Sequence, residues 1–375
     1  MVHVTDPLTV DAFRDRTRAF LADAVADGVA CPAFGAILPP AMLEPAVAWQ
    51  RHCYEHGFAG IHWPAEHGGR GLTRAHTVVW YEECARAAVA PYVNLQGIVL
   101  AGEAVLRSGT DAQRHQFLRP TISAEILWCQ LFSEPGAGSD LAGLETTADL
   151  DGDRYVVNGQ KVWTSNGDLA HFGILMARTD RELPKHKGIS FFLLDMSLPG
   201  VEVRPLRQMT GDAEFCEVFL TDVPMPADAL LGPVNGGWGV AMEVLQDERG
   251  SVGQAGVIDL ERRLERLRRR AGADDLVARD QVARLLARGG ALRALMLRRA
   301  GQAGVAPVTK LARSELDFSA VLVETALVGA AAMLHGDTTE RLLSSPGMRI
   351  AGGTSEIQRN IIGERVLGLP REPAG

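Results

Sequence analysis

The sequence of 375 residues lacks the features that mark several classes of protein. Its cysteines are few and odd in number, and no Cys-x-x-Cys pair occurs, so neither a disulfide framework nor a zinc site is expected. A formal net charge of -8 argues against nucleic-acid binding. No uninterrupted apolar run reaches the roughly 18 residues of a membrane span, and no basic and apolar leader opens the chain, so a cytoplasmic protein without a membrane span is expected. The cysteines are Cys31, Cys53, Cys84, Cys129 and Cys216.

What the chain does have is enough apolar sequence for a large core, since 46% of its residues are hydrophobic and 22% are charged. Apolar residues recur at helical spacing in 1–124, alternate with period two in 125–232, and return to helical spacing in 233–375. This pattern predicts an α+β protein with an N-terminal α-helical domain, a middle β domain and a C-terminal α-helical domain at those boundaries. Helices are predicted at 11–25, 43–54, 77–88, 240–257, 260–270, 281–300 and 316–334, and strands at 172–178, 188–195, 200–204 and 217–223.

One stretch, residues 127–167, combines a glycine-rich loop with strand-forming residues. The segment Ser-Glu-Pro-Gly-Ala-Gly-Ser-Asp at 133–140 leaves backbone N–H groups open to an anion. Further on, 155–157 and 162–164 favour strands, and the Asn158-Gly159 pair between them predicts a hairpin turn. Trp163 then stands beside small hydroxyl residues, where an indole could face a flat ring rich in heteroatoms. Taken singly, such a loop is usually only a turn, and a strand Trp usually packs in a core.

Together and in this order, the two motifs resemble the acyl-CoA dehydrogenase family of flavoenzymes, in which the glycine-rich segment is followed by Asn-Gly-x-Lys-x-Trp. Two further segments are similar to the family's: Trp-Pro-Ala-Glu-His-Gly-Gly-Arg-Gly at 63–71 and Gly-Thr-Ser-Glu-Ile-Gln at 353–358. The resemblance spans nearly the whole chain. It implies an acyl-CoA dehydrogenase-like fold with an N-terminal helical domain, a β-barrel-like middle domain and a C-terminal four-helix bundle.

The resemblance also implies a reaction, the FAD-dependent α,β-dehydrogenation of an acyl thioester in fatty acid or lipid metabolism. An α-proton is removed by a carboxylate in a dry pocket that raises its pKa, and a β-hydride passes to the flavin. The implied substrate is an acyl-CoA, converted to a trans-2-enoyl-CoA, or an acyl group on a carrier protein. The implied partners are an electron-transfer flavoprotein and further subunits of a homo- or hetero-oligomer, a dimer or a tetramer.

The position of the catalytic base departs from the commoner family pattern. Many members carry a Glu directly before Gly-Thr-Ser, where this chain has Gly352 in front of Gly353. A minority carry the carboxylate on an earlier helix before an Arg, and Glu248, followed by Arg249, falls at that position. Glu248 is therefore the expected base, and the glycine at 352 indicates a bulky or branched acyl group.

The remaining site residues follow from the same matching of positions. The expected cofactor-binding residues are Gln130, Leu131, Phe132, Ser133, Gly138, Ser139, Trp163, Thr164, Ser165, Thr354 and Glu356. The expected substrate-binding residues are Ser139, Arg249, Gly352 and Gly353. No metal is expected, because His62 and His67 have no evident third ligand.

Several alternatives remain open. The family often has Arg-x-x-Phe-Gly and Gln-x-x-Gly-Gly elements that serve the cofactor across a subunit interface, but Arg270 runs into Ala-Gly-Ala-Asp-Asp, and 326–332 reads Ala-Leu-Val-Gly-Ala-Ala-Ala. A non-catalytic or partner-dependent subunit of a hetero-oligomer is thus one alternative, and a flavin monooxygenase on the same scaffold is another. Glu248 favours the dehydrogenase, because a monooxygenase needs no α-proton base. The basic segment 184–188 is either a solvated turn or a contact for nucleotide phosphates.

Overall fold

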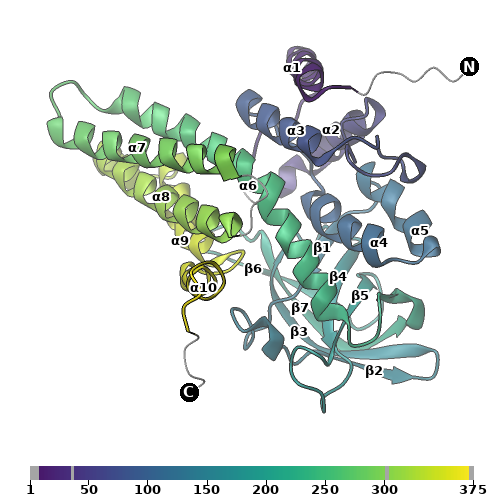
Figure 1. Ribbon diagram of the computed structural model, residues 1–375. Helices are drawn as coiled ribbons and strands as arrows, with labels where there is room; N and C mark the ends of the chain where they lie inside the picture. Colours follow the sequence, from purple (N-terminus) through teal and green to yellow (C-terminus); the bar gives the residue numbers. More distant parts are fainter. Residues whose placement is uncertain (1–7, 35–37, 300–303, 371–375) are drawn as a thin grey trace, which may run out of the picture. The chain divides into compact units, whose positions relative to one another are not determined.

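The fold is described from a computed structural model, which defines residues 8–34, 38–299 and 304–370, with the side chains of Pro40, 246–255 and 297–299 left out. The chain forms two compact units (Figure 1). The first contains residues 1–208 and 213–251, and the second contains 209–212 and 252–375.

The first unit begins with helices that enclose a core of aromatic side chains. The predicted helices at 11–25, 43–54 and 77–88 are confirmed to within a few residues, and Thr9 caps the first by accepting a hydrogen bond from the Ala12 amide at 3.2 Å. Trp49, Trp63 and Trp80 are almost completely buried among them. The helices are α1 (Val10–Ala26), α2 (Leu43–Glu55), α3 (Arg74–Ala87), α4 (Gly102–Ser108) and α5 (Asp111–Ile122).

An eight-stranded sheet, drawn in teal in Figure 1, follows these helices. Its strands are β1 (Trp128–Leu131), β2 (Thr147–Asp151), β3 (Arg154–Ser165), β4 (Phe172–Arg178), β5 (Ile189–Asp195), β6 (Val201–Leu206), β7 (Phe215–Pro226) and β8 (Leu230–Leu231). The strand order is β6-β7-β3-β2-β4-β5-β8, and β1 pairs in parallel with β4. Just beyond β1, the Ser133 carbonyl accepts a hydrogen bond from the Val162 amide of β3 at 2.9 Å. This bond closes a ring of β1, β4, β2 and β3, which gives the domain its barrel-like form.

The predicted hairpin at Asn158-Gly159 is wrong. Both residues lie inside the continuous strand β3, where the ladder to β7 shifts register, so they form a bulge rather than a turn. Asn158 is held there by Asp222, whose backbone amide donates to the Asn158 side-chain oxygen at 2.8 Å. The actual turn precedes β3, because Asp151 of β2 pairs with Arg154.

All five cysteines of the chain are buried free thiols. Cys129 and Cys216 belong to β1 and β7, and Cys53 and Cys84 belong to α2 and α3. Burial raises the pKa of each thiol, including that of Cys31. The expectation of a chain without disulfides agrees with this arrangement.

The second unit is a helical bundle that begins within α6 (Gly237–Arg270), which continues into it from the first unit. The predicted helices 240–257 and 260–270 are one continuous helix here. Apolar residues of α6, α7 (Leu276–Arg299) and α8 (Val305–Val328) share a core, and α9 (Asp337–Ile350) packs on α8. Arg263 lies inside this unit, paired with Asp317 at 2.9 Å and Glu324 at 3.2 Å.

The segment Val305–Met333, which comprises α8 and a short 3-10 turn, is long and apolar enough to cross a membrane by length and composition alone. The sequence prediction of no such run counted only uninterrupted apolar residues and therefore missed it. Asp317 and Glu324 interrupt the run, and both form ion pairs with Arg263, as expected of a helix packed in a bundle. A large part of its apolar surface is nevertheless exposed in the single chain, including Leu322 and Met333.

Candidate active site

Trp163 is the most unusual residue of the sheet. Its side chain is 57% exposed, although its neighbours Val162 and Thr164 are buried. Its backbone is left-handed, with φ of 59°, a conformation that costs a non-glycine residue about 1–3 kcal/mol and that gathers at functional sites. The indole packs edge-on against the Phe215 ring, 5.8 Å between centroids. More than half of the surface of this large aromatic residue is therefore open to solvent.

Polar groups accompany this ring. Ser165 on β3 and Gln130 and Ser133 at the end of β1 are each half-buried. A flat ring with heteroatoms along its edge suits an aromatic platform flanked by hydroxyl and amide groups. The residues present thus fit the isoalloxazine ring of a flavin.

Three of the predicted cofactor residues point their side chains into the protein. Leu131 belongs to the core of the sheet, and Phe132 packs edge-on against Phe191. Thr164 is fully buried, and its hydroxyl has no hydrogen-bond partner in the described part of the chain. These three residues can meet a cofactor only through their backbone.

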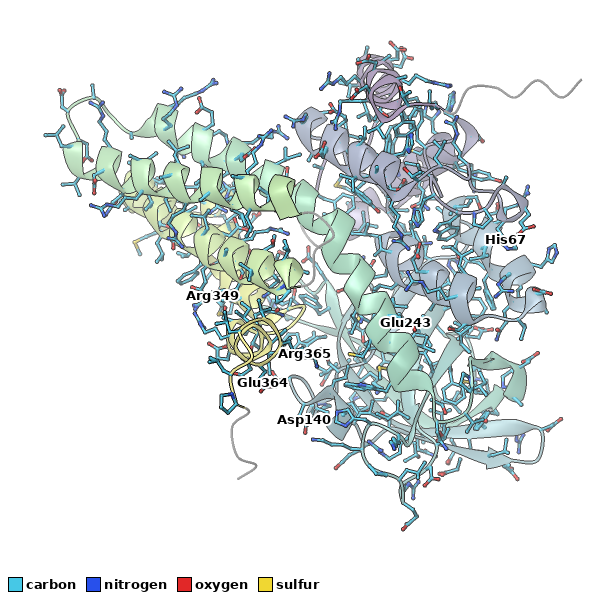
Figure 2. The ribbon with its side chains drawn as sticks, in the orientation of Figure 1. His67, Asp140, Glu243, Arg349, Glu364 and Arg365 are labelled. Atoms are coloured by element: carbon cyan, nitrogen blue, oxygen red, sulfur yellow. The ribbon has the colours of Figure 1, made fainter. Side chains whose placement is uncertain are left out.

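The glycine-rich loop that follows β1 is open to solvent. Gly138 and Ser139 are exposed, and a Cβ added at Gly138 would meet no atom within 4 Å. Asp140, labelled in Figure 2, ends the motif and receives Lys185 at 2.9 and 2.8 Å on its two carboxylate oxygens. The basic segment 184–188 therefore supplies at least one side chain to this loop, and an exposed pair of this kind contributes little stability.

A buried ion pair lies behind the two motifs, and sequence reasoning missed it. The ammonium group of Lys161 lies 2.7 Å from the Glu134 carboxylate, and both side chains are buried. Burial lowers the pKa of Lys161 to about 8, although Glu134 offsets part of this effect. Burial alone would raise the pKa of Glu134, but Lys161 and backbone N–H groups outweigh it, so the pKa falls below its usual value. The sequence did contain an indication of this pair, because Glu134 and Lys161 are the charged residues named in the glycine-rich motif and in the Asn-Gly-x-Lys-x-Trp motif.

The predicted residues of the C-terminal segment lie together in the second unit. Gly352 and Gly353 both have left-handed backbones, with φ of 65° and 93°, which favour glycine. Thr354 caps α10 (Ser355–Ile361) by accepting a hydrogen bond from the Ile357 amide at 3.2 Å, and Glu356 is exposed in its first turn. Thr354 therefore already has a structural role.

Glu315 of α8 fixes the start of this segment. Its carboxylate accepts hydrogen bonds from the Ser355 hydroxyl at 2.7 Å and from Arg349, labelled in Figure 2, at 2.9 Å. These contacts lower the pKa of Glu315 and keep it ionised.

The predicted base, Glu248, and the adjacent Arg249 belong to the helical backbone of α6, but their side chains lie outside the described residues. Their roles stay predictions. No cluster of metal-ligating side chains occurs among the described residues, and His62 instead contacts Thr77 at 3.0 Å and Glu103 at 2.6 Å.

Comparison with known proteins decides the family. Models of the acyl-CoA dehydrogenase N-terminal, middle and C-terminal domains match residues 9–125, 129–223 and 235–367. The chain belongs to the acyl-CoA dehydrogenase family. Acyl-CoA dehydrogenases are flavoproteins whose cofactor is FAD, in agreement with the platform around Trp163.

Curated relatives match this acyl-CoA dehydrogenase over nearly its full length. It is 40% identical to acyl-CoA dehydrogenase IpdE1 of Mycobacterium tuberculosis over 98% of this chain and 99% of the relative. It is 39% identical to IpdE1 of Mycolicibacterium smegmatis over 98% and 100%.

Solved structures give the same fold. The Tcur3481-Tcur3483 steroid ACAD has a TM-score of 0.82 at 26% identity, covering 98% of this chain and 99% of that one. The ChsE4-ChsE5 complex from Mycobacterium tuberculosis has a TM-score of 0.81 at 26% identity, covering 99% and 100%.

Proposed function

We propose that this enzyme desaturates a bulky acyl-CoA at its α,β position, with Glu248 as the base that takes the α-proton. The observation that carries the proposal is the exposed, left-handed Trp163, with the half-buried Ser165 on the same strand and Ser133 on the segment bonded to it, which suits a bound flavin. When bound, FAD supplies the acceptor for the β-hydride. The Trp163 ring would pack against the flavin, and the Ser165 and Ser133 hydroxyls would be available as hydrogen-bond donors to it.

The position of Glu248 is supported by the backbone at 352. A left-handed residue with φ of 65° favours glycine over a carboxylate-bearing side chain, so the base is better placed on α6. We assign Arg249, Ser139, Gly352 and Gly353 to the binding of the acyl-CoA. A Cβ added at Gly352 would meet no atom within 4 Å, which leaves room for a bulky acyl group, and one similar structure is that of a steroid ACAD, so a polycyclic acyl-CoA is the first substrate to test.

The enzyme further requires other proteins in this proposal. The exposed apolar residues of α8 and the turn after it, such as Leu322 and Met333, provide a surface for a second subunit. That subunit is either a second copy or a homologous partner, since one similar structure is a complex of ChsE4 with ChsE5. An electron-transfer flavoprotein accepts the electrons, and the reaction takes place in the cytoplasm.

The test is the rate at which acyl-CoA substrates bleach the flavin absorbance of the purified protein under anaerobic conditions. Glu248→Gln should retain FAD but reduce flavin on the order of 10³-fold more slowly, because a positioned base contributes roughly 10²–10⁴-fold. Asp247→Asn is the matched control, because neighbouring positions on an α-helix are about 100° apart around its axis, and this change should leave the rate within a few-fold.

The outcomes separate the candidate functions. Full-rate bleaching by Glu248→Gln would contradict the assignment of the base. A wild-type flavin that never bleaches with acyl-CoA, but consumes oxygen when reduced in other ways, would favour the monooxygenase. A chain that binds no FAD alone, yet binds it with a co-expressed homologous partner, would favour the partner-dependent subunit.

A further inference from the structure

Lys161 is a charged residue at a position that water does not reach. Its side chain is completely buried, yet it lies on β3 only two residues before the exposed Trp163. An ammonium group in such a place is unfavourable unless it is paired and hydrogen-bonded. Its Nζ atom donates to the Phe132 carbonyl at 3.1 Å and to the Glu134 carboxylate at 2.7 Å. Among the described residues, the side chain therefore bonds to the segment that follows β1.

Glu134 extends this connection to a third segment. Its carboxylate also accepts hydrogen bonds from the backbone amides of Glu145, at 2.6 Å, and Thr146, at 2.9 Å, just before β2. The Glu134 backbone exchanges two hydrogen bonds with Ala137, which closes the turn of the glycine-rich loop. A single ion pair thus holds together β3, the end of β1 with its loop, and the approach to β2.

Trp163 depends on this connection because the neighbouring strand does not hold it. The β3–β7 ladder pairs Lys161 with Val218 and Thr164 with Cys216, but it skips Val162 and Trp163. The Val162 amide bonds instead to the Ser133 carbonyl, on the same segment that Lys161 holds. The left-handed turn at Trp163 is therefore supported from the side of residues 132–134.

We propose that Lys161 is a positioning residue for the flavin site: with Glu134 it fixes the Ser133 segment against β3 and thereby sets the place of the Trp163 platform. The proposal rests on the flavin site argued above. Lys161 itself does not touch the ligand, since its side chain has no exposed surface. Its effect on the cofactor passes through Trp163 and Ser133.

The test compares Lys161→Met, which keeps the length of the side chain but removes the charge, with Glu134→Gln and with wild type. The matched control is Glu83→Gln, because Glu83 is another buried carboxylate of the first unit, paired with Arg14 and Arg18 away from the two motifs. Two quantities are measured on the apoprotein: hydrogen exchange of the backbone amides of Glu134, Gly136, Ala137 and residues 162–164, and the dissociation constant of added FAD. The visible absorbance spectrum of the loaded protein is the third.

In Lys161→Met, exchange at the Val162 and Ala137 amides should rise at least about tenfold, FAD should bind at least about tenfold more weakly, and the flavin band should shift in the protein that is loaded. Glu83→Gln should lower the melting temperature without any of these changes. Should Lys161→Met fail to fold, Glu134→Gln is measured in its place and is expected to show the same changes.

Unchanged exchange at Val162 and unchanged FAD binding in the variants would overturn the proposal. So would equal effects in Glu83→Gln, because they would mean that Lys161 contributes only general stability. The result for the proposed function is read separately. A wild-type chain that takes up no FAD, either alone or with a co-expressed homologous partner, refutes the flavin site, whereas the exchange comparison on the apoprotein still decides whether Lys161 fixes the Trp163 segment.

Discussion

Replacing Glu103 by Gln tests how a buried carboxylate stabilises the N-terminal helices of the first unit. Glu103 lies on α4 with only 4% of its surface exposed. Its carboxylate accepts hydrogen bonds from Trp63 at 3.1 Å and from Arg74 at 2.9 Å, and the His62 Nε2 atom lies 2.6 Å away. Gln keeps one oxygen acceptor, but it removes the charge and turns an amide donor toward one of these donors.

The expected loss in the free energy of unfolding depends on how deeply Glu103 and its partner Arg74 are buried. Removing one partner of a fully buried pair costs about 3–5 kcal/mol. The Arg74 side chain is half-exposed and keeps part of its hydration, so Glu103→Gln should lower the free energy of unfolding by about 2–3 kcal/mol at pH 7. Asp149→Asn is the control. Its pair with Arg181 is exposed on both sides, so no measurable change is expected.

Acid should remove the difference between wild type and Glu103→Gln. Burial alone would raise the pKa of Glu103, but His62 and Arg74 outweigh it, so the pKa in the folded protein lies below its usual value. A carboxyl with a lowered folded-state pKa stabilises fully above its unfolded pKa of about 4.3, and this contribution is lost as the pH falls through the folded value. The two proteins should therefore converge in stability on acidification.

The assay is urea unfolding followed by tryptophan fluorescence, because Trp49, Trp63 and Trp80 are buried among these helices. Titrations at pH 7 and at a series of lower pH values give both the size of the effect and its loss. The reasoning is refuted if Glu103→Gln unfolds at the same urea concentration as wild type at pH 7. A difference in unfolding free energy between Glu103→Gln and wild type that stays constant down to pH 3 would equally refute the ionised state assigned to Glu103.

Two further changes test backbone fit and the platform. Gly69→Ala should lower the free energy of unfolding by at least about 2 kcal/mol in thermal or urea unfolding, because its Cβ would lie 2.2 Å from the Trp63 carbonyl oxygen, a backbone atom that cannot rotate away. The control is Gly239→Ala, whose Cβ would meet no atom within 4 Å, and a melting temperature of Gly69→Ala equal to that of wild type would contradict the packing. Trp163→Leu should leave the melting temperature of the apoprotein unchanged, since the ring is exposed, but weaken FAD binding on the order of tenfold in a fluorescence titration. Unaltered affinity would remove Trp163 from the site.

Local patterns were sufficient for most of the secondary structure. Helical periodicity located α1 and α2 within about a residue at each end, because apolar side chains recur there at helical spacing. β4 and β5 were also located, although both are nearly continuous apolar runs that are buried on both faces rather than alternating strands. The same local reasoning failed at Asn158-Gly159, because pairing with β7 and the contact with Asp222 made a bulge of a favourable turn pair.

The candidate site was also predicted only in part from local sequence patterns. Trp163 and its hydroxyl neighbours were found from the motif, yet the motif gave no indication that Thr164 points inward while Trp163 points outward, since this depends on the break in the β3–β7 ladder. The pair of Lys161 with Glu134 joins residues 27 positions apart, and only the folded sheet brings them together. The role of Glu248 stays a prediction from the family resemblance.

The burial of every cysteine has a consequence for an enzyme that makes this product. The proposed product is an α,β-unsaturated thioester, whose β-carbon is attacked by thiolates. All five thiols are out of solvent, and burial raises the pKa of each, so the reactive thiolate form is scarce and shielded. The folded chain therefore has no accessible thiol that its own electrophilic product could alkylate. Covalent adducts at Cys53 or Cys84 would identify molecules that had unfolded locally or completely.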